Sequence, residues 1–388
     1  MTIPKIRFFQ LEKQNLLAKN PAGDYHPLLR KHIALHSTDY LTPYFSLWAR
    51  QDEFKPESML EDLNITRTAL RLRAFRGTVF VMDKDLIQET IEAKKYYYAA
   101  SRMGEVEKLS KKVGFDLAAF EKRIDRLLEG RRVLSMSEIK KELASELDVA
   151  SEVFPYWLRY LEFIGMLCRG TQKHIADRSV KYALLRELFP QIRTSIAPEE
   201  AFDSLMERYI GLFGPVALED LCWWFPVTKT MARESLGRMG EKIVSFSHDG
   251  RECFMEAGDY ELYKDYKPPA STKNPAVAFL PYEDHFPKAY FLRDWFLSPE
   301  AAKIVMRKGT IYRGQIFPSI WVNGEIVGGW EILWGDKRKS SAKIKITGLV
   351  SQMGMKIPSH HLIESKRQEL EEFINVSICP LMKPMRSD

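Results

Sequence analysis

Hydrophobic and polar positions along the chain repeat one local order three times: two amphipathic helices followed by a short β-ribbon. In the clearest copy, Ser135 and Glu138 have the spacing of an S-x-x-E capping box, which predicts a helix start. The expected elements are a helix to Leu147, a turn at 148–150, a helix over 151–164, and strands at 166–169 and 180–184. A helix-turn-helix followed by a β-ribbon is typical of a winged helix, whose second helix usually enters a DNA groove.

The other two copies flank this one in the sequence. The third predicts helices over 198–213, 217–225 and 228–239, then strands over 242–246 and 252–256. The first is less regular, with helices predicted over 26–35, 42–50 and 65–75 and a strand over 78–82. Three tandem copies are stronger evidence than a single match, because chance does not keep repeating the same order of elements.

After a Pro/Lys/Ser-rich linker at 264–275, the pattern changes from helical to β. Strands are expected over 276–280, 310–312, 316–322, 325–333 and 342–346, with a hairpin turn at Asn323-Gly324 and a closing helix over 360–376. We therefore predict an α+β protein: three tandem winged-helix domains followed by a small C-terminal barrel or curled sheet. The expected domains are 1–116 (with a helical bridge), 117–196, 197–263 and 264–388.

Composition narrows the class of protein. The 388 residues carry a net charge of +6, which is compatible with nucleic-acid binding. No apolar run reaches the ~20 residues of a membrane span, and the N-terminus lacks a signal-peptide core, so we expect a cytoplasmic, nucleoid-associated protein. The four cysteines are scattered without metal-ligand spacing, so neither a metal nor another cofactor is expected. Three DNA-binding modules in one chain remove the usual need for a dimer, which predicts a monomer.

Short motifs in a fixed order extend over nearly the whole chain. They are Leu35-His36-Ser37-Thr38-Asp39 with the segment 43–50, Arg76-Gly77-Thr78, Arg208-Tyr209 with Gly214-Pro215 and Asp220, the segment 280–284 with Tyr290 and Arg293, and the segment 322–330. Together they resemble the AlkZ-like/YcaQ-like family of bacterial DNA glycosylases. The resemblance implies three winged helices and a C-terminal β-barrel around a concave DNA channel. It also implies hydrolysis of the N-glycosidic bond of alkylated purines, in some members within interstrand crosslinks.

The chain departs from the family where the chemistry is expected. Active members carry Gln-x-Gln or Gln-x-Asp at the position of His36-Ser37-Thr38, and a histidine is common at the position of Phe80. An alkylated purine already bears a positive charge, so the enzyme must mainly steady a cationic sugar and hold a water. His36 could hold that water or act as a base, and Thr38 could give it a second hydrogen bond. Asp39 could stabilise the sugar cation. In the alternative interpretation, this polar run only caps the helix that starts near Thr42.

Further candidates surround this motif. Asp284 and His285 either line the channel, or Asp284 fixes the turn at 290–293 by hydrogen bonds. Contacts with double-stranded, damaged DNA are expected from nine basic side chains: Arg71, Arg73, Arg76, Lys173, Lys229, Arg233, Lys337, Arg338 and Lys339. Such contacts are mainly to phosphate, which predicts salt-sensitive binding with little sequence preference.

Three functions compete at this point. The first is a DNA glycosylase. It is expected to be monofunctional, because the motif at 35–39 contains no lysine that could form a Schiff base. The second is a damage- or structure-specific DNA-binding protein without hydrolysis, which the missing glutamines favour. A transcription regulator ranks last, because such proteins usually pair one winged helix with a dimerisation or ligand domain.

Overall fold

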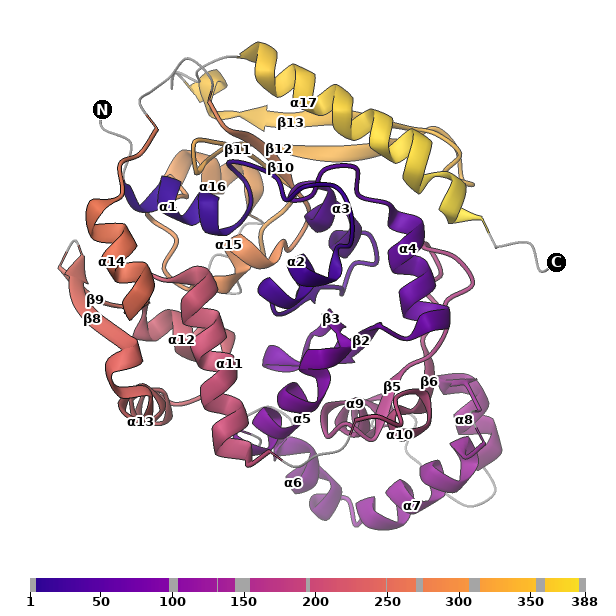
Figure 1. The fold of residues 1–388 in the computed structure, drawn as a ribbon. Coiled ribbons are helices and arrows are strands. Elements are labelled where there is room, and N and C mark those ends of the chain that lie inside the picture. Colours follow the sequence, from indigo (N-terminus) through magenta and orange to yellow (C-terminus); the bar gives the residue numbers. More distant parts are fainter. Residues whose placement is uncertain are drawn as a thin grey trace.

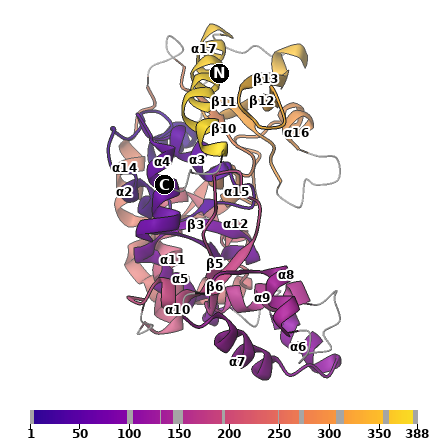
Figure 2. The same cartoon turned by 90° about the vertical axis from the view of Figure 1, so that its right-hand side faces the viewer.

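The computed structural model describes residues 5–97, 104–130, 132–143, 154–192, 196–248, 250–269, 275–306, 315–353 and 360–383. Within these ranges the protein mixes helices with four small antiparallel sheets. Figure 1 shows the C-terminal sheet and its long helix at the top and residues 26–83 around the centre. In Figure 2 the C-terminal sheet and the helices within residues 104–163 lie at opposite ends, with the three-stranded sheet within residues 35–83 between them.

Three segments, here named the first, second and third repeats, share one element order: a helix, a short strand, two helices and two strands. The first repeat contains α2 (His26–Lys31), β1 (Leu35–His36), α3 (Thr42–Trp48), α4 (Pro56–Glu61), β2 (Ala69–Arg73) and β3 (Val79–Asp83). The second contains α7 (Leu117–Leu128), β4 (Leu134–Ser135), α8 (Met136–Leu143), α9 (Phe154–Phe163), β5 (Leu167–Arg169) and β6 (Lys181–Leu184). The third contains α11 (Pro198–Phe213), β7 (Val216–Ala217), α12 (Leu218–Trp224), α13 (Lys229–Met239), β8 (Ile243–His248) and β9 (Arg251–Glu256).

Each repeat also has the same sheet order, with its last strand in the middle: β1-β3-β2, β4-β6-β5 and β7-β9-β8. The predicted capping box is confirmed, because Ser135 N–H donates to Glu138 Oε2 over 2.7 Å and Glu138 N–H donates to Ser135 Oγ over 3.3 Å. Thr228 caps α13 by accepting from Met231 N–H over 3.2 Å. The predicted turn at 148–150 lies outside the described residues.

One helix prediction in the first repeat is wrong. Instead of a helix over 65–75, the chain forms a π-helical turn at Asp62–Thr66 and then strand β2. Leu70 and Leu72 pair with Met82 and Phe80 of β3, so large apolar side chains recur at every second position. A period of two residues is that of a strand, and pairing with β3 selected it over the helical pattern.

Helices connect and brace the repeats. The predicted helical bridge is formed by α5 (Ile87–Tyr96) and α6 (Gly104–Lys112), which lie between the first and second repeats in the sequence. Helix α5 packs along α11. The remaining helices are α1 (Lys5–Lys13), α10 (Leu185–Leu188) and α14 (Ala257–Asp265). The largest core joins the first and third repeats to the C-terminal region, whereas a second core lies mostly within the second repeat. No helix among the described residues is long and apolar enough to cross a bilayer.

Of the two predicted forms, a barrel or a curled sheet, the barrel is wrong for the described residues of the C-terminal region, which form an open sheet. Strands β10 (Val277–Leu280), β11 (Ser319–Val322), β12 (Glu325–Trp334) and β13 (Ala342–Leu349) pair in that order, and β10 does not close onto β13. Barrel closure around a packed interior takes about eight strands. Here α17 (His360–Phe373) packs on β10 and β13, with α15 (His285–Ala289) and α16 (Pro299–Val305) nearby. The hairpin turn at Asn323-Gly324 is as predicted, with φ of 51° and 78°. The predicted strand at 310–312 lies outside the described residues.

Candidate active site and nucleic-acid interface

Two neighbouring cavities share four lining residues, and together they are here named the trough. The first, the basic groove (about 640 Å³), separates the first repeat from the second and is lined by residues 37–40, Arg71, Arg73, residues 77–79, Arg159, Arg169, Gly170, Gln172, residues 177–181 and Tyr282. The second, the aromatic pocket (about 440 Å³), separates the first repeat from the C-terminal sheet and is lined by residues 39–42, Phe45, Arg178, Pro281, Tyr282, Ile304, Phe317, Pro318, residues 330–332, Trp334, Lys339 and Thr347. Both cavities include Asp39, Tyr40, Arg178 and Tyr282.

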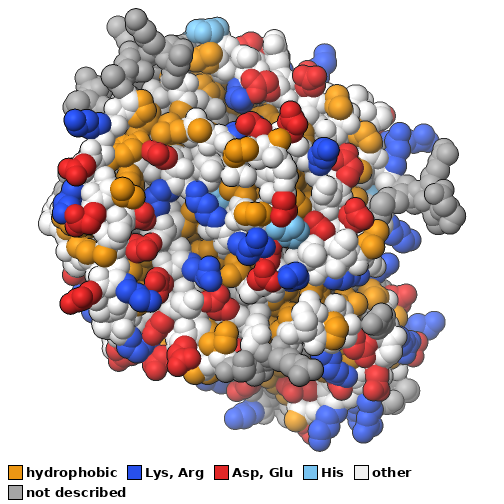
Figure 3. Space-filling model, viewed as in Figure 1, with side chains coloured by type: hydrophobic (Ala, Val, Ile, Leu, Met, Phe, Trp, Pro, Cys, Tyr) orange, Lys and Arg blue, Asp and Glu red, His pale blue; other side chains and the backbone are white. Residues whose placement is uncertain are grey.

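Positive charge dominates the lining of the basic groove. Its cationic side chains are Arg71, Arg73, Arg159, Arg169, Arg178 and Lys181, against two carboxylates, Asp39 and Asp177. Arg159 and Arg178 are exposed, whereas Arg73 and Arg169 both pair with the buried carboxylate of Glu162. On the face shown in Figure 3, by contrast, basic and acidic side chains are interspersed. A groove lined by cations suits a polyanion such as a nucleic-acid backbone.

Two of the three predicted catalytic residues, Thr38 and Asp39, line this trough, whereas His36 lines neither cavity. Thr38 is exposed and Asp39 is half-buried, and both line the groove. His36 lies one layer below, on β1, and is only 1% exposed. Its Nε2 lies 3.4 Å from Thr38 Oγ1 and 3.8 Å from Glu283 Oε2. Burial, together with Lys288 and Arg76, lowers the pKa of His36 well below its ordinary value, so the ring is neutral at physiological pH.

The alternative interpretation, that the polar run caps α3, does not hold. The N-cap residue of α3 is Leu41, which makes no side-chain capping bond. Asp39 Oδ1 instead accepts from Leu41 N–H over 2.9 Å, and Ser37 Oγ accepts from Arg71 Nε over 3.1 Å. These bonds hold the loop that presents Thr38 and Asp39 to the trough.

The structure adds Glu283 and Lys288, which the sequence analysis did not single out. Both are at least 95% buried, and they form an ion pair behind His36. Glu283 has a left-handed backbone (φ 57°), and its N–H donates to Ile316 O over 3.0 Å. Burial and the charges of Arg76 and Arg293 lower the pKa of Lys288 to about 6. Glu283 belongs to the motif at 280–284, but the motif does not tell which of its side chains faces His36.

The residues predicted to line a channel, Asp284 and His285, are fully buried and line neither cavity. Asp284 accepts from Ser46 Oγ over 2.6 Å and pairs with both terminal nitrogens of Arg50 over 2.7 and 2.9 Å. His285 Nε2 lies 2.7 Å from His32 Nδ1, and burial lowers the pKa of both rings.

The alternative prediction, that Asp284 holds the turn at 290–293 by hydrogen bonds, is also wrong. The turn near 290–293 is held by Asp220, whose Oδ1 accepts from Phe291 N–H and Leu292 N–H over 2.7 and 3.0 Å. Asp284 is structural, but it anchors Arg50 rather than this turn.

The nine predicted DNA contacts divide into groups. Arg71, Arg73 and Lys339 line the trough. Lys173, Lys337 and Arg338 are exposed, the last two at the tip of the β12–β13 hairpin. These three, like the remaining three, lie outside the lining of both cavities. Of the remaining three, Arg76 stacks on Trp223 at 4.3 Å, Lys229 pairs with Glu219, and Arg233 pairs with Glu252. The sequence analysis did not single out four basic residues of the groove: Arg159, Arg169, Arg178 and Lys181. Arg178 lies between the predicted strands at 166–169 and 180–184, and Lys181 lies near the start of the second of them.

Among the described residues, no three His, Cys, Asp or Glu side chains lie close enough together to hold a metal ion.

The comparison with known proteins decides the family. A model of the family "DNA glycosylase AlkZ-like" matches residues 29–371. The chain belongs to this family.

Two known proteins are similar to this AlkZ-like chain, one in sequence and one in structure. The "Interstrand DNA cross-link repair glycosylase" of Streptomyces sahachiroi is 24% identical over 181 residues, which cover 45% of this chain and 46% of that protein. The aligned part thus spans about half the length of that curated relative. The solved structure of "Streptomyces sahachiroi DNA glycosylase AlkZ" superposes with a TM-score of 0.73 at 16% identity, covering 98% of this chain and 97% of that one. The superposition shows a shared fold over the whole length.

Proposed function

We propose that this member of the AlkZ-like family hydrolyses the N-glycosidic bond of alkylated purines in double-stranded DNA, including purines held in interstrand crosslinks. The observation that carries the proposal is that Thr38 and Asp39 line a groove with a cationic lining, and that Thr38 Oγ1 lies 3.4 Å from Nε2 of the neutral His36 ring. We further propose that the three repeats are winged-helix domains, that the trough is the DNA channel, and that the protein acts as a monomer.

In this proposal each polar side chain has a distinct part. The alkylated base leaves as a neutral purine with the bonding electrons, and positive charge develops on the sugar. The Asp39 carboxylate stabilises that charge, because an opposite charge is strongest in a site that excludes water. Thr38 and His36 hold the water whose oxygen then bonds to the sugar carbon, and the proton that this water loses passes to solvent. The lowered pKa of His36 suits a hydrogen-bonding role better than that of a base. Glu283, 3.8 Å from His36, helps to orient the ring.

The geometry also favours a monofunctional enzyme. A Schiff base with the sugar needs a lysine that reaches the substrate in its neutral form. Lys288, the lysine near His36, is 5% exposed and paired with Glu283. Of the two lysines that line the trough, Lys339 donates to the Tyr40 hydroxyl and Lys181 belongs to β6 of the second repeat. Borohydride should therefore trap no covalent complex between the protein and its damaged duplex.

Release of alkylated base tests the proposal directly. Duplexes carrying N7-methylguanine or N3-methyladenine are incubated with wild-type protein, Asp39→Asn and His36→Ala, with Asp265→Asn, on the exposed end of α14, as the matched control. We expect release by the wild type and the control, and at least tenfold slower release by the other two at unchanged duplex affinity. Asp39→Asn keeps the hydrogen bond to Leu41, so its loss of rate reports the lost charge. Release that survives Asp39→Asn contradicts its assignment.

A second candidate function rests on the departure at His36-Ser37-Thr38 from the glutamine motif. In that case the protein binds damaged DNA without hydrolysing it. Wild-type protein would then release no base from either duplex, yet it would bind the damaged duplex more tightly than the undamaged one, with strong salt dependence.

A further inference from the structure

We propose that Arg71 on β2 forms a phosphate subsite in the basic groove, which binds one backbone phosphate of the damaged strand and ties it to the loop at residues 37–39. The proposal rests on the glycosylase function above and deepens it, because it assigns the point where the duplex backbone meets that loop. Contact with a phosphate requires no movement of the base. The subsite therefore suits a purine held in an interstrand crosslink as well as an unlinked lesion.

Arg71 is a buried cation without a counterion among the described residues. Its side chain belongs to the lining of the basic groove, yet the residue is only 7% exposed. Its Nη2 is buried without a hydrogen-bond partner, and no described carboxylate forms an ion pair with the guanidinium. Burial lowers the pKa of Arg71, but an arginine keeps its proton in proteins. A buried charge is costly unless it is paired, so an anion from outside the chain would stabilise this site.

The groups around Arg71 do not neutralise it. Asp177 acts on the guanidinium electrostatically, but its carboxylate already accepts from two backbone N–H groups over 2.9 Å each. Arg169 adds a like charge. The Tyr44 hydroxyl is neutral, because burial raises its pKa to about 12. The charge of Arg71 is thus left for a ligand to balance.

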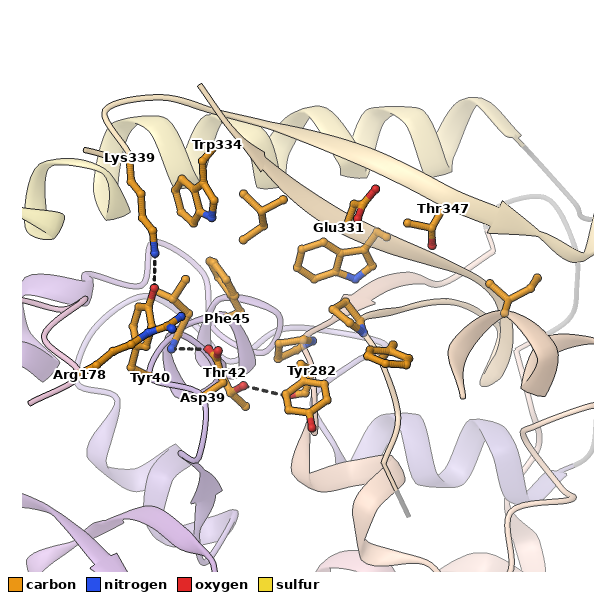
Figure 4. A pocket seen from close by; sticks show the side chains of 17 residues that line it. Asp39, Tyr40, Thr42, Phe45, Arg178, Tyr282, Glu331, Trp334, Lys339 and Thr347 are labelled. Atoms are coloured by element: carbon orange, nitrogen blue, oxygen red, sulfur yellow. Dashed lines mark hydrogen bonds between the residues drawn. The ribbon is translucent and has the colours of Figure 1, made fainter. Parts of the chain in front are cut away.

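Two other arginines of the groove already have partners within the protein. Arg73 pairs with the buried carboxylate of Glu162. The Arg178 guanidinium lies 5.0 Å from the centre of the Tyr40 ring, and Figure 4 shows the two side chains together at the edge of the aromatic pocket. Arg71, by contrast, keeps an unused donor. A planar guanidinium matches the oxygens of a phosphate, which makes a phosphodiester the fitting anion in a groove that suits nucleic acid.

The same guanidinium also holds the loop at residues 37–39. Arg71 Nε donates to Ser37 Oγ over 3.1 Å, and Ser37 N–H donates to Val79 O over 2.8 Å. Thr38 and Asp39 follow directly in the chain and line the same groove. A phosphate bound at Arg71 therefore lies close to the loop that is proposed to act on the sugar. Arg71 is in this sense a positioning residue, because small displacements between reacting groups cost large factors in rate.

Methylphosphonate linkages test the subsite without relying on hydrolysis. A methylphosphonate carries no negative charge, so it is placed at each linkage near the lesion in turn. Binding of the full-length protein is measured by fluorescence anisotropy on duplexes that contain a 2′-fluoro N7-methylguanosine, whose sugar resists hydrolysis. We expect one linkage where the substitution weakens wild-type binding about tenfold, the scale of a charged hydrogen bond. At that linkage Arg71→Met should lose no further affinity, whereas Arg159→Met, a matched change at an exposed arginine of the same groove, should still lose it.

Ser37→Ala separates the phosphate contact from the loop. It removes the acceptor of Arg71 Nε but keeps the guanidinium, so the sensitivity to methylphosphonate should persist. On the cleavable duplex with saturating protein, Arg71→Met and Ser37→Ala should both release base at least tenfold more slowly than wild type. Arg186→Met, which breaks a surface pair with Asp125, is the control for this rate.

Outcomes separate the subsite from the proposed reaction. Loss of sensitivity in Arg71→Met but not in Arg159→Met supports the subsite even when the cleavable duplex releases no base, in which case only the reaction is overturned. Equal sensitivity of wild type and Arg71→Met at every linkage overturns the subsite, and so does a wild type that is insensitive at every linkage. Unchanged base release by Ser37→Ala overturns the tie to the loop. If Arg71→Met does not fold, Arg71→Gln takes its place, because glutamine keeps an N–H donor for Ser37 but carries no charge.

Discussion

Removing Arg50 should destabilise the protein more than removal of any surface cation. Arg50, two residues after the end of α3, and Asp284, at the start of α15, are both 0% exposed, and the guanidinium also donates to Ser46 O over 2.9 Å. In Arg50→Ala the carboxylate keeps its bonds from Ser46 Oγ and Phe286 N–H but loses its only paired arginine. Leaving one member of a buried pair uncompensated costs about 3–5 kcal/mol.

The expected shift in melting temperature follows from chain length. Unfolding entropy near the midpoint is about 2.1 cal/mol/K per residue, or about 0.8 kcal/mol/K for a chain of 388 residues unfolding as one unit. A loss of about 3–5 kcal/mol therefore lowers Tm by about 4–6 °C. Thermal unfolding followed by circular dichroism measures this shift. The control is Arg186→Ala, which breaks an exposed pair with Asp125 and should cost at most about 1 kcal/mol.

A double variant separates the buried charge from simple loss of packing. Replacing the pair by apolar side chains, Arg50→Met with Asp284→Leu, removes the uncompensated carboxylate and should recover most of the lost stability. The reasoning is refuted if Arg50→Ala shifts Tm no more than Arg186→Ala. It is equally refuted if the double variant is no more stable than Arg50→Ala, because the loss would then reflect packing and hydrogen bonds rather than charge.

Two further predictions concern pH and DNA contact. The hydrogen bond to Asp83, and the charges of Asp83 and Asp62, raise the pKa of His26, so its stabilising effect is complete below about pH 6.5 and is lost as the pH rises through the folded-state pKa. His26→Gln should therefore lower Tm more at pH 5.5 than at pH 8.5, and equal shifts would contradict this. Arg159→Ala, in the basic groove, should reduce the salt dependence of duplex binding by about one ion, whereas Arg233→Ala on α13 should not; the opposite result would move the DNA to α13.

Local signals in the sequence determined most of the element order. The capping box at Ser135 and the Asn323-Gly324 turn act over four residues or fewer, and both form as predicted. Helix α11 begins and ends at the predicted residues, because Pro198 and Gly214-Pro215 bound its apolar periodicity. Such features need no distant partner, which is why a single sequence reveals them.

Only the tertiary structure decided the site. Glu283, Asp284 and His285 are consecutive, yet the first faces His36, the second anchors Arg50 and the third contacts His32, because each meets a partner more than 200 residues away in the sequence. The basic surface was decided in the same way. Lys229 and Arg233 have acidic partners within 20 residues, whereas Arg159 and Arg178 face a groove that exists only once the first two repeats have packed. Short-range periodicity selects helices and strands, but side-chain environments depend on which distant segments meet, and pairing across those distances leaves no local pattern in the sequence.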